Sequence, residues 1–237
     1  QWTEHEPSFK RGEKVKLYLK QEQDGIYTVV GGDKGKESLE AKEVQSPGYY
    51  WEGHRWLVLP VKYYINPALS PFTYESTVKQ SFQTWEDDPG SKIDYTYMGT
   101  TTRVFGRDNY NVVFLGLIDG PGNILATCTF WYVIATKEIV EFDIEFDKDD
   151  PWVVWEHAPS PLSFDVGNVG THEAGHSLGL LDLYGSGDTS ETMYGYSSKG
   201  QTTKRTLYTG DLKGLNLAYP VTYNLGTTIY TDKTLYR

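Results

Sequence analysis

The sequence predicts an α+β fold, and three observations support this class. Apolar residues recur at helical spacing near residue 80 and again near residue 215. Between these segments lie several runs rich in β-branched and aromatic residues, which are typical of strands. A hydrophobic fraction of 38% and an aromatic fraction of 15% over 237 residues are sufficient for a sizeable core. Few helices among several strands favour one sheet covered by helices.

Three helices are predicted along the chain. The first begins near Pro71 and ends at the turn-forming stretch 88–90. Its apolar face comprises Tyr74, Val78, Phe82 and Trp85. A second helix is expected over 166–178, and a third over 210–219, which Pro220 ends.

Five runs predict the strands of the main sheet. They are LVLPVKYYI (57–65), IDYTYM (93–98), NVVFLGL (111–117), ILATCTFWYV (124–133) and IVEFDIEF (139–146). The last run alternates apolar and acidic residues, so it is predicted to be a half-buried strand.

Residues 1–56 are predicted to form a β-rich N-terminal extension, and residues 57–237 the main domain. The stretch KVKLYLK alternates at period two, and turns are expected at Asp24-Gly25 and Gly31-Gly32. Two interpretations stay open, a structural addition and the remnant of a pro-segment that covers a cleft. The aromatic cluster GYYWEGHRW is expected to anchor the extension, with His54 packed inside it.

The negative net charge of the chain disfavours nucleic acid and anionic membranes as binding partners. The net charge is −10 and the isoelectric point about 5.0, so no block of basic residues is available for nucleic acid or an anionic membrane. A neutral or cationic substrate, or metal ions, are favoured instead. The longest apolar runs, such as 112–117, are too short to span a bilayer, and no membrane insertion is expected. The single cysteine, Cys128, is expected to be a small buried hydrophobe.

The stretch THEAGHSLGLLDLY, residues 171–184, carries the chemistry. On a helix, His172 and His176 lie on one face and can present two imidazole nitrogens to one zinc ion. Glu173 then lies beside the metal, where it can take a proton from a bound water and later deliver one to a leaving amine. This is the physical content of the H-E-x-x-H pattern.

Asp182 is predicted to be the third metal ligand. Gly179 allows the chain to leave the helix sharply, so that a side chain three residues later can return to the same ion. Two histidines, one aspartate and a water satisfy the open tetrahedral pattern of catalytic zinc. The alternative, a structural helix without metal, would require Gly179, Asp182 and also Met193, in the stretch SETMYGY at 190–196, all to be coincidental.

The pattern H-E-x-x-H-x-x-G-x-x-D resembles the metzincin signature of zinc proteases, in the snapalysin variant that ends in Asp. The stretch SETMYGY at 190–196 resembles the Met-turn of that clan, with Met193 beneath the metal. The resemblance implies a zincin-like fold with a twisted, mostly parallel mixed sheet and an active-site helix. It also implies a C-terminal subdomain that contains the Met-turn and a C-terminal helix.

The stretches DGPGNILATCTF (119–130) and DIEFDKDDPW (143–152) resemble the matrixin branch of the metzincins. The resemblance implies an edge strand that pairs with extended substrate and includes Leu125 and Ala126. It also implies calcium ligands at Asp119, Gly120, Gly122, Ile124, Asp147 and Asp150. The alternative is that DKDD is a solvated acidic turn.

Other positions depart from the matrixin pattern or have two interpretations. Thr127 and Glu145 stand where that family has structural zinc ligands, so no structural zinc is expected. Tyr184 matches a snapalysin tyrosine that could hydrogen-bond a developing oxyanion, but packing in the wall is equally consistent. Tyr194 and Tyr196 are expected to line the pocket for the substrate residue after the scissile bond.

The predicted function is a zinc-dependent endopeptidase that cleaves extended polypeptide and acts as a monomer. The alternative is a metal-stabilised binding module without turnover. A secreted or extracellular location is expected from protease activity and calcium. The start at Gln1 fits both a removed leader and a trimmed chain.

Overall fold

The computed structural model describes residues 48–68, 70 and 73–221, together with four short strands before them. The chain divides into two compact units, Gln1–Gln45 and Ser46–Arg237. In the first unit, β1 (Val15–Leu17) pairs antiparallel with β4 (Lys36–Ser38), and β2 (Leu19–Gln21) with β3 (Tyr27–Val29). The predicted turns at Asp24-Gly25 and Gly31-Gly32 lie outside the described residues, as does the tail after Val221. The role of the N-terminal extension therefore stays a prediction.

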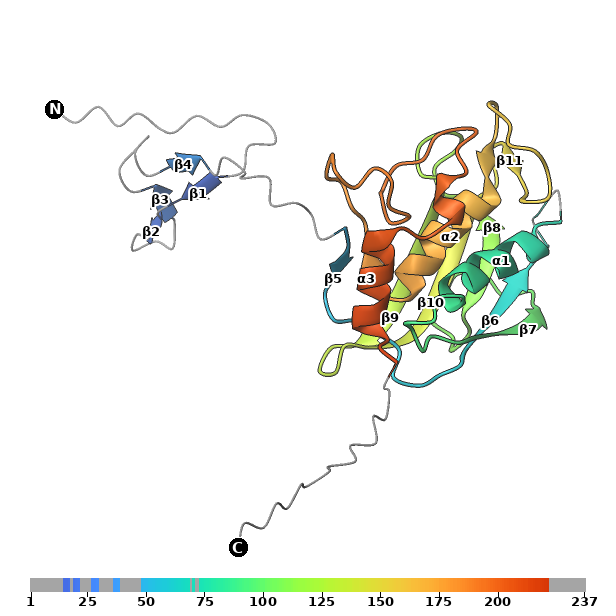
Figure 1. The fold of residues 1–237 in the computed structure, drawn as a ribbon, viewed down its shortest axis with the longest axis horizontal. Helices are drawn as coiled ribbons and strands as arrows, with labels where there is room; N and C mark the ends of the chain where they lie inside the picture. Colours follow the sequence, from blue (N-terminus) through green and yellow to red (C-terminus); the bar gives the residue numbers. More distant parts are fainter. Residues whose placement is uncertain are drawn as a thin grey trace, which may run out of the picture. The chain divides into compact units, whose positions relative to one another are not determined.

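The second unit is built on a five-stranded sheet with the order β7-β6-β8-β10-β9 (Figure 1). Its strands are β6 (Val61–Asn66), β7 (Tyr95–Thr100), β8 (Val112–Gly116), β9 (Ala126–Val133) and β10 (Glu138–Asp147). Four of them run parallel, and β9 pairs antiparallel with β10. The predicted α+β class with a mostly parallel mixed sheet is confirmed.

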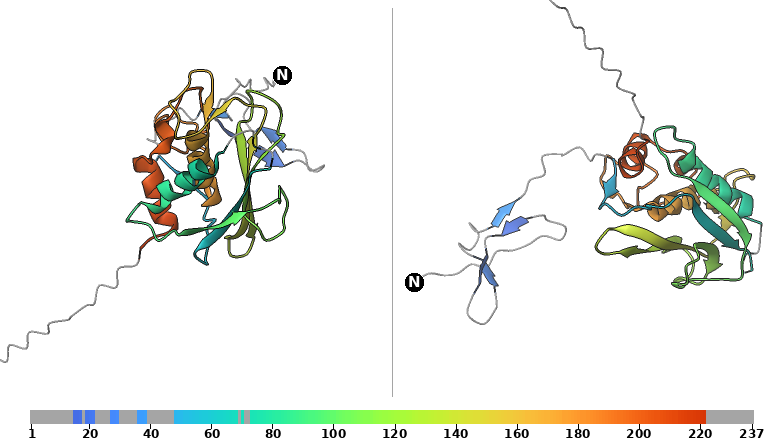
Figure 2. Two further views of the ribbon diagram at one scale, coloured as in Figure 1. Left: turned by 90° about the vertical axis from the view of Figure 1, so that its right-hand side faces the viewer. Right: turned by 90° about the horizontal axis from the view of Figure 1, so that it is seen from below.

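The described part of this unit contains three α-helices: α1 (Glu75–Glu86), α2 (Val166–Ser177) and α3 (Thr209–Ala218). Both α1 and α2 lie on the same face of the sheet (Figure 2). The carboxylate of Asp165 caps α2 by accepting the Asn168 N–H at 2.7 Å. All three helices lie where the sequence predicts them, although α1 begins at Glu75, four residues after the expected start.

The core lies between the helices and the sheet. The indole of Trp85, on α1, donates a hydrogen bond of 2.8 Å to the carbonyl of Thr171 on α2. This bond satisfies a polar group that would otherwise be buried without a partner. It ties the two helices together directly beside the H-E-x-x-H segment. The largest fully buried side chains include Trp85, Tyr74, Tyr219, Phe82, Phe142 and Phe146.

Strand β10 differs from the prediction of a half-buried strand. Its residues Glu141 and Asp143 are each only 1% exposed. The Glu141 carboxylate accepts the N–H groups of Asp108 and Asn109, and Asp143 accepts those of Gly106 and Val112. The prediction was wrong because these acids do not face solvent. They satisfy the backbone of the loop that precedes β8.

Two short ladders position the chain around α2. Strand β5 (Tyr50–Trp51) pairs antiparallel with β13 (Leu180–Leu181), and β11 (Trp152–Val153) pairs parallel with β12 (Phe164–Asp165). The first ladder fixes the segment that follows α2. The second fixes the segment that precedes it.

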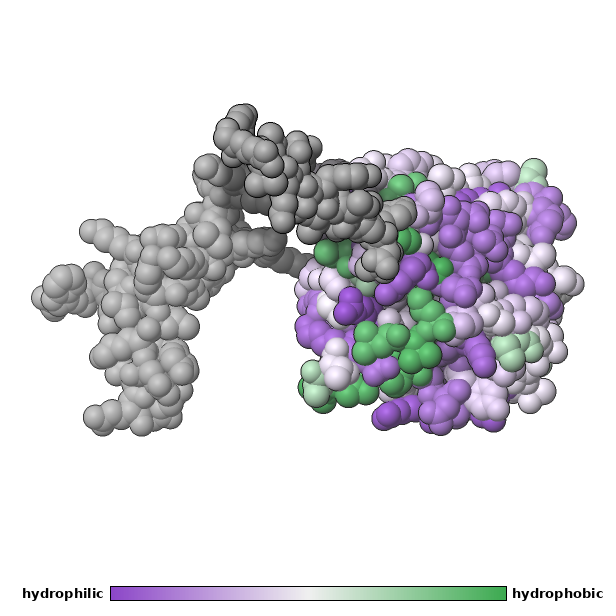
Figure 3. Space-filling view, turned by 60° about the horizontal axis from the view of Figure 1, so that its bottom comes forward, coloured by the Kyte–Doolittle hydropathy of each residue, from purple (hydrophilic) through white to green (hydrophobic). Residues whose placement is uncertain are grey.

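The surface of the second unit is mixed in polarity. Figure 3 shows one face, on which apolar side chains form a continuous area among polar ones. Exposed apolar residues of this unit include Leu57, Val58 and Ile134. Within the described part of the chain, no helix is long and apolar enough to span a bilayer.

Candidate metal centre and substrate cleft

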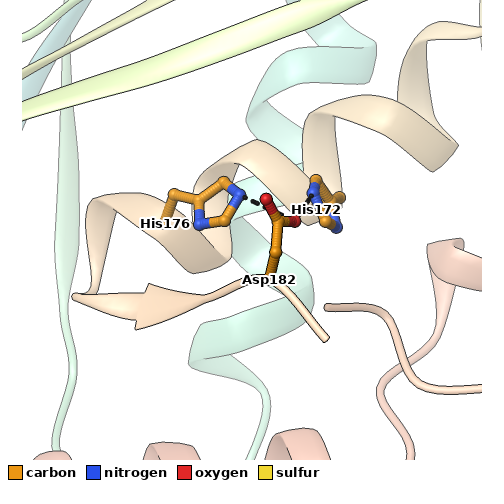
Figure 4. Close-up of side chains that lie close together, drawn as sticks. All are labelled: His172, His176 and Asp182. Carbon is orange, nitrogen blue, oxygen red and sulfur yellow. Dashed lines mark ion pairs between the residues drawn. The ribbon is translucent and has the colours of Figure 1, made fainter. Parts of the chain in front are cut away.

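His172, His176 and Asp182 come together at the end of α2. Their ligand atoms all lie within 4.8 Å of one another, the only such group of His, Cys, Asp or Glu among the described residues. Figure 4 shows both imidazoles on one side of α2, with the Asp182 carboxylate facing them from the segment after β13. The sequence predicts these same three residues as the ligands of one zinc ion.

Gly179 makes the return of Asp182 possible. Its φ is +89°, a left-handed conformation that ends the helix, and its N–H donates to the carbonyl of His176 at 2.8 Å. A β-carbon at this position would lie 2.2 Å from the backbone oxygen of His54. Glycine is therefore required here both by backbone conformation and by space.

Two backbone carbonyls orient the imidazoles. Nδ1 of His172 donates to the carbonyl of Thr192 at 2.7 Å, and Nδ1 of His176 donates to that of Leu180 at 2.8 Å. Because a carbonyl oxygen can only accept, the proton of each neutral ring resides on Nδ1. Each Nε2 is then an unprotonated donor atom available to a metal.

The two Nε2 atoms and Oδ1 of Asp182 are spaced as ligands of one cation. Nε2 of His172 and of His176 lie 3.1 and 3.5 Å from Oδ1 of Asp182. Two ligands of one tetrahedral zinc ion lie about 3.3 Å apart. Three electron-pair donors converge here, and Oδ1 is buried without a hydrogen-bond partner. This arrangement is unfavourable unless a cation lies among them.

The carboxylate of Asp182 is held ionised. Burial alone would raise the pKa of Asp182, but positive charge at the Nε2 atoms of His172 and His176, whether carried by protons or by a bound cation, lowers it. Its second oxygen, Oδ2, accepts a hydrogen bond of 3.0 Å from the hydroxyl of Tyr184. Tyr184 is 61% exposed, so it contacts the ligand from the solvent side.

Glu173 and the metal-ligating side chains border one cavity of about 750 Å³. The Glu173 side chain is only 5% exposed, and its Oε2 has no hydrogen-bond partner. A buried carboxylate oxygen without a partner requires a donor. A water or a substrate group in the cavity can supply it.

Met193 is fully buried and packs against Gly175 of α2. Its Sδ would be 2.3 Å from a β-carbon at position 175, so Gly175 of HEAGH permits this close approach. The turn around Met193 is held by Asp211 of α3, whose carboxylate accepts the N–H groups of Thr192 at 2.7 Å and Met193 at 3.1 Å. Helix α3 thereby positions the Thr192 carbonyl that orients His172.

The cavity is bordered on one side by the edge strand β9 and the residues that precede it. Leu125 and Ala126 line this side, and β9 has one partner, β10, among the described strands. Tyr196, Gly195 and Ser197 also line the cavity. Tyr194 does not line the cavity, although its backbone lies beside Leu183.

The segment predicted to hold calcium folds over the end of β10. Asp147 Oδ2 accepts the N–H groups of Asp119 and Gly120, and Asp150 Oδ1 accepts that of Gly122 at 2.8 Å. Ile124 donates its N–H to Asp119 Oδ1 at 3.3 Å. The six predicted residues therefore lie in two segments, 119–124 and 147–150, that hydrogen bonds join. Asp150 Oδ2 is buried without a partner.

Several residues of the site carry no strong sequence signal. The carbonyls of Thr192 and Leu180 orient the imidazoles, and any residue type supplies a carbonyl. Lys204 borders the cavity and is 1% exposed, yet it stands in the polar stretch QTTKRT, which is typical of a surface loop. Cys128 also borders the cavity, where burial raises the pKa of its thiol, as expected for an inert cysteine.

The fold and this site define a metalloprotease-type catalytic domain. The profile of the matrixin family matches residues 54–220, and the chain belongs to that family. Family membership implies zinc metalloendopeptidase activity at the level of the family, and the His172, His176 and Asp182 cluster suits that metal.

Two human proteins illustrate the similarity. The chain is 25% identical to neutrophil collagenase from Homo sapiens over 165 residues, which are 67% of this chain and 31% of that protein. It is 33% identical to matrilysin from Homo sapiens over 101 residues, which are 43% of this chain and 33% of that protein. The matched region spans about a third of the length of each relative.

Proposed function

We propose that this chain is a zinc-dependent endopeptidase that hydrolyses peptide bonds of extended polypeptides. The observation that carries the proposal is the convergence of two oriented imidazoles and an ionised carboxylate beside an unpaired Glu173. The third ligand is an aspartate, which adds negative charge to the site. We therefore expect a weaker Lewis acid than three neutral imidazoles would give.

The protein residues have distinct roles in this proposal. A bound zinc ion would lower the pKa of a water molecule to about 7 and polarise the substrate carbonyl. Glu173 takes the proton of that water and delivers a proton to the leaving amine. Asp182, His172 and His176 hold the ion, and Met193 forms the apolar base beneath them.

Strand β9 is proposed to bind the substrate backbone. An edge strand offers free N–H and C=O groups, and an extended peptide can add to it as a further strand. Leu125 and Ala126 border the cavity at the point where such a peptide would pass Glu173. Binding through backbone groups tolerates many substrate sequences, so selectivity must come from the side-chain pocket beside Tyr196.

The alternative is a binding module that keeps the metal but lacks turnover. A buried Glu173 with an unpaired oxygen disfavours this alternative, since a module without catalysis gains nothing from that unpaired group. A shortened chain without residues 1–45 separates the two ideas. Proteolysis that appears only after shortening would assign an inhibitory role to the extension, whereas a zinc-loaded but inert shortened chain would favour the module.

Elemental analysis and a cleavage assay test the proposal together. The purified full-length chain should contain about one zinc ion and should cleave an unfolded labelled protein. Chelation should abolish cleavage, and zinc should restore it. A chain that binds zinc but never cleaves unfolded protein, full-length or shortened, would contradict the proposal. We also propose a calcium ion at the 119–124 turn and an extracellular location, in keeping with the matrixin resemblance.

A further inference from the structure

Lys204 is a buried cation beside the cavity. It lies in the 3₁₀ turn η2 (Thr203–Arg205), and its side chain is 1% exposed. Its Nζ donates to the carbonyl of Tyr194. Throughout the part of the chain that the structure describes, no carboxylate oxygen lies within 4.0 Å of this Nζ. An ammonium group has three protons to donate, so this lysine keeps donor capacity that the protein does not fill.

The position of Lys204 is fixed relative to the metal centre. Its backbone N–H donates to the side-chain oxygen of Asn168 at 2.9 Å, and Asn168 lies on α2 one turn before His172. The next residue, Arg205, forms a paired contact with Asp165, the residue that caps α2. The helix that carries His172 and Glu173 therefore also holds the turn that carries Lys204.

A buried charge with no carboxylate in direct contact is costly, which indicates a missing partner. Burial lowers the pKa of Lys204 to about 8, while the carboxylates of Glu173, Asp182 and Asp211 oppose this decrease. The amine is thus still mainly protonated at pH 7. Lys204 borders the cavity together with Val169, Tyr196 and Ser197. Val169 and the ring of Tyr196 offer apolar contact beside this one cation, which suits a side chain that has an aliphatic stem and a carboxylate end.

We infer that Lys204 determines specificity by pairing with an acidic side chain, glutamate above all, at the substrate position that directly follows the scissile bond. This inference rests on the proposed endopeptidase function. The net charge of −10 does not oppose it, because net charge acts on long-range encounter whereas a single buried cation acts within the pocket. The overall preference for neutral or cationic substrates and a local preference for one acidic side chain are compatible.

Two peptides that differ only in glutamate or glutamine at this position test the inference. They have the same shape, so the ratio of their kcat/KM values reports the charge alone. With the zinc-loaded full-length chain, we expect the glutamate peptide to be cleaved at least about tenfold more efficiently. In Lys204→Met the ratio should fall to about one or below, because the stem is kept and the cation is lost. Lys199→Met, which removes an exposed cation from the same segment, should leave the ratio unchanged.

The outcomes separate the two proposals. If the zinc-loaded parent cleaves neither peptide nor unfolded protein, the proposed function fails. If the parent cleaves both peptides and the ratio of their kcat/KM values is near one, the inference about Lys204 is overturned while the proposed function stands. This comparison uses the parent chain alone. A ratio that stays high in Lys204→Met also overturns it. If Lys204 served only to support the Tyr194 carbonyl, Lys204→Met would lower both rates equally and preserve the ratio.

Discussion

Nε2 of His172 lies 3.1 Å from Oδ1 of Asp182, and the hydrogen bond from Nδ1 of the same ring to Thr192 leaves that Nε2 without a proton. Two electron-pair donors therefore face each other at the separation of ligands that share one ion. The relationship makes Asp182 the third metal ligand in our account.

Asp182→Ala should lose zinc affinity strongly, because two imidazoles remain and the negative charge is gone. Asp182→His should retain zinc and shift the pH profile of activity, since it restores a third ligand without the charge. Zinc affinity is measured by competition with a chromophoric chelator. The exposed Asp94 supplies the control, and Asp94→Ala should bind zinc like the parent. Equal affinity of Asp182→Ala and the parent would place the third ligand elsewhere.

Tyr184→Phe distinguishes positioning of a ligand from stabilisation of an oxyanion. The Tyr184 hydroxyl donates to Oδ2 of Asp182, so its loss should loosen that carboxylate and weaken zinc binding about tenfold. The same competition assay measures this change, and kcat is measured at saturating zinc. Unchanged zinc affinity with a large fall in kcat would assign Tyr184 to the oxyanion instead.

Gly179→Ala should destabilise the catalytic unit by at least about 2 kcal/mol. The added β-carbon would lie 2.2 Å from the His54 oxygen, and the φ of +89° disfavours any other residue. Urea unfolding measures the free energy of unfolding. Gly187→Ala is the matched control, because a β-carbon there meets nothing within 4 Å. Similar unfolding of both variants would show that the exit from α2 tolerates a side chain.

Calcium should raise the melting temperature of the parent at constant zinc. Burial raises the pKa of Asp150, and its Oδ2 has no partner, so a cation at this oxygen would stabilise the folded chain. Asp150→Asn should remove the calcium response, whereas Asp149→Asn, at an exposed neighbour, should keep it. A melting temperature that does not respond to calcium would favour a solvated acidic turn.

The helices and the sheet could be predicted because their apolar patterns are regular. Val78, Phe82 and Trp85 recur at helical spacing, and all three are buried on α1. Strand β10 was predicted less well, because alternating apolar and acidic residues normally indicate one solvent-facing side. Glu141 and Asp143 are buried instead, since they bind backbone N–H groups of a loop that is distant in sequence. Such a long-range partner leaves no local pattern.

The metal cluster could be proposed from sequence because its spacing is local. His172, His176 and Asp182 all lie within eleven residues, counted from the first to the last. The groups that orient them could not be predicted in the same way. The carbonyl of Thr192 is placed by Asp211 on α3, and Lys204 is placed by Asn168 on α2. These relationships depend on the packing of separate elements rather than on any pattern of residue types.

Comparing Glu173→Gln with the parent tests the proposed role of Glu173 as the catalytic base. Glutamine keeps the size of the side chain but cannot accept the proton of a water molecule as a base. We predict that zinc content is unchanged and that kcat for an unfolded protein substrate falls about a thousandfold. A Glu173→Gln variant that binds zinc and cleaves as fast as the parent would contradict the account.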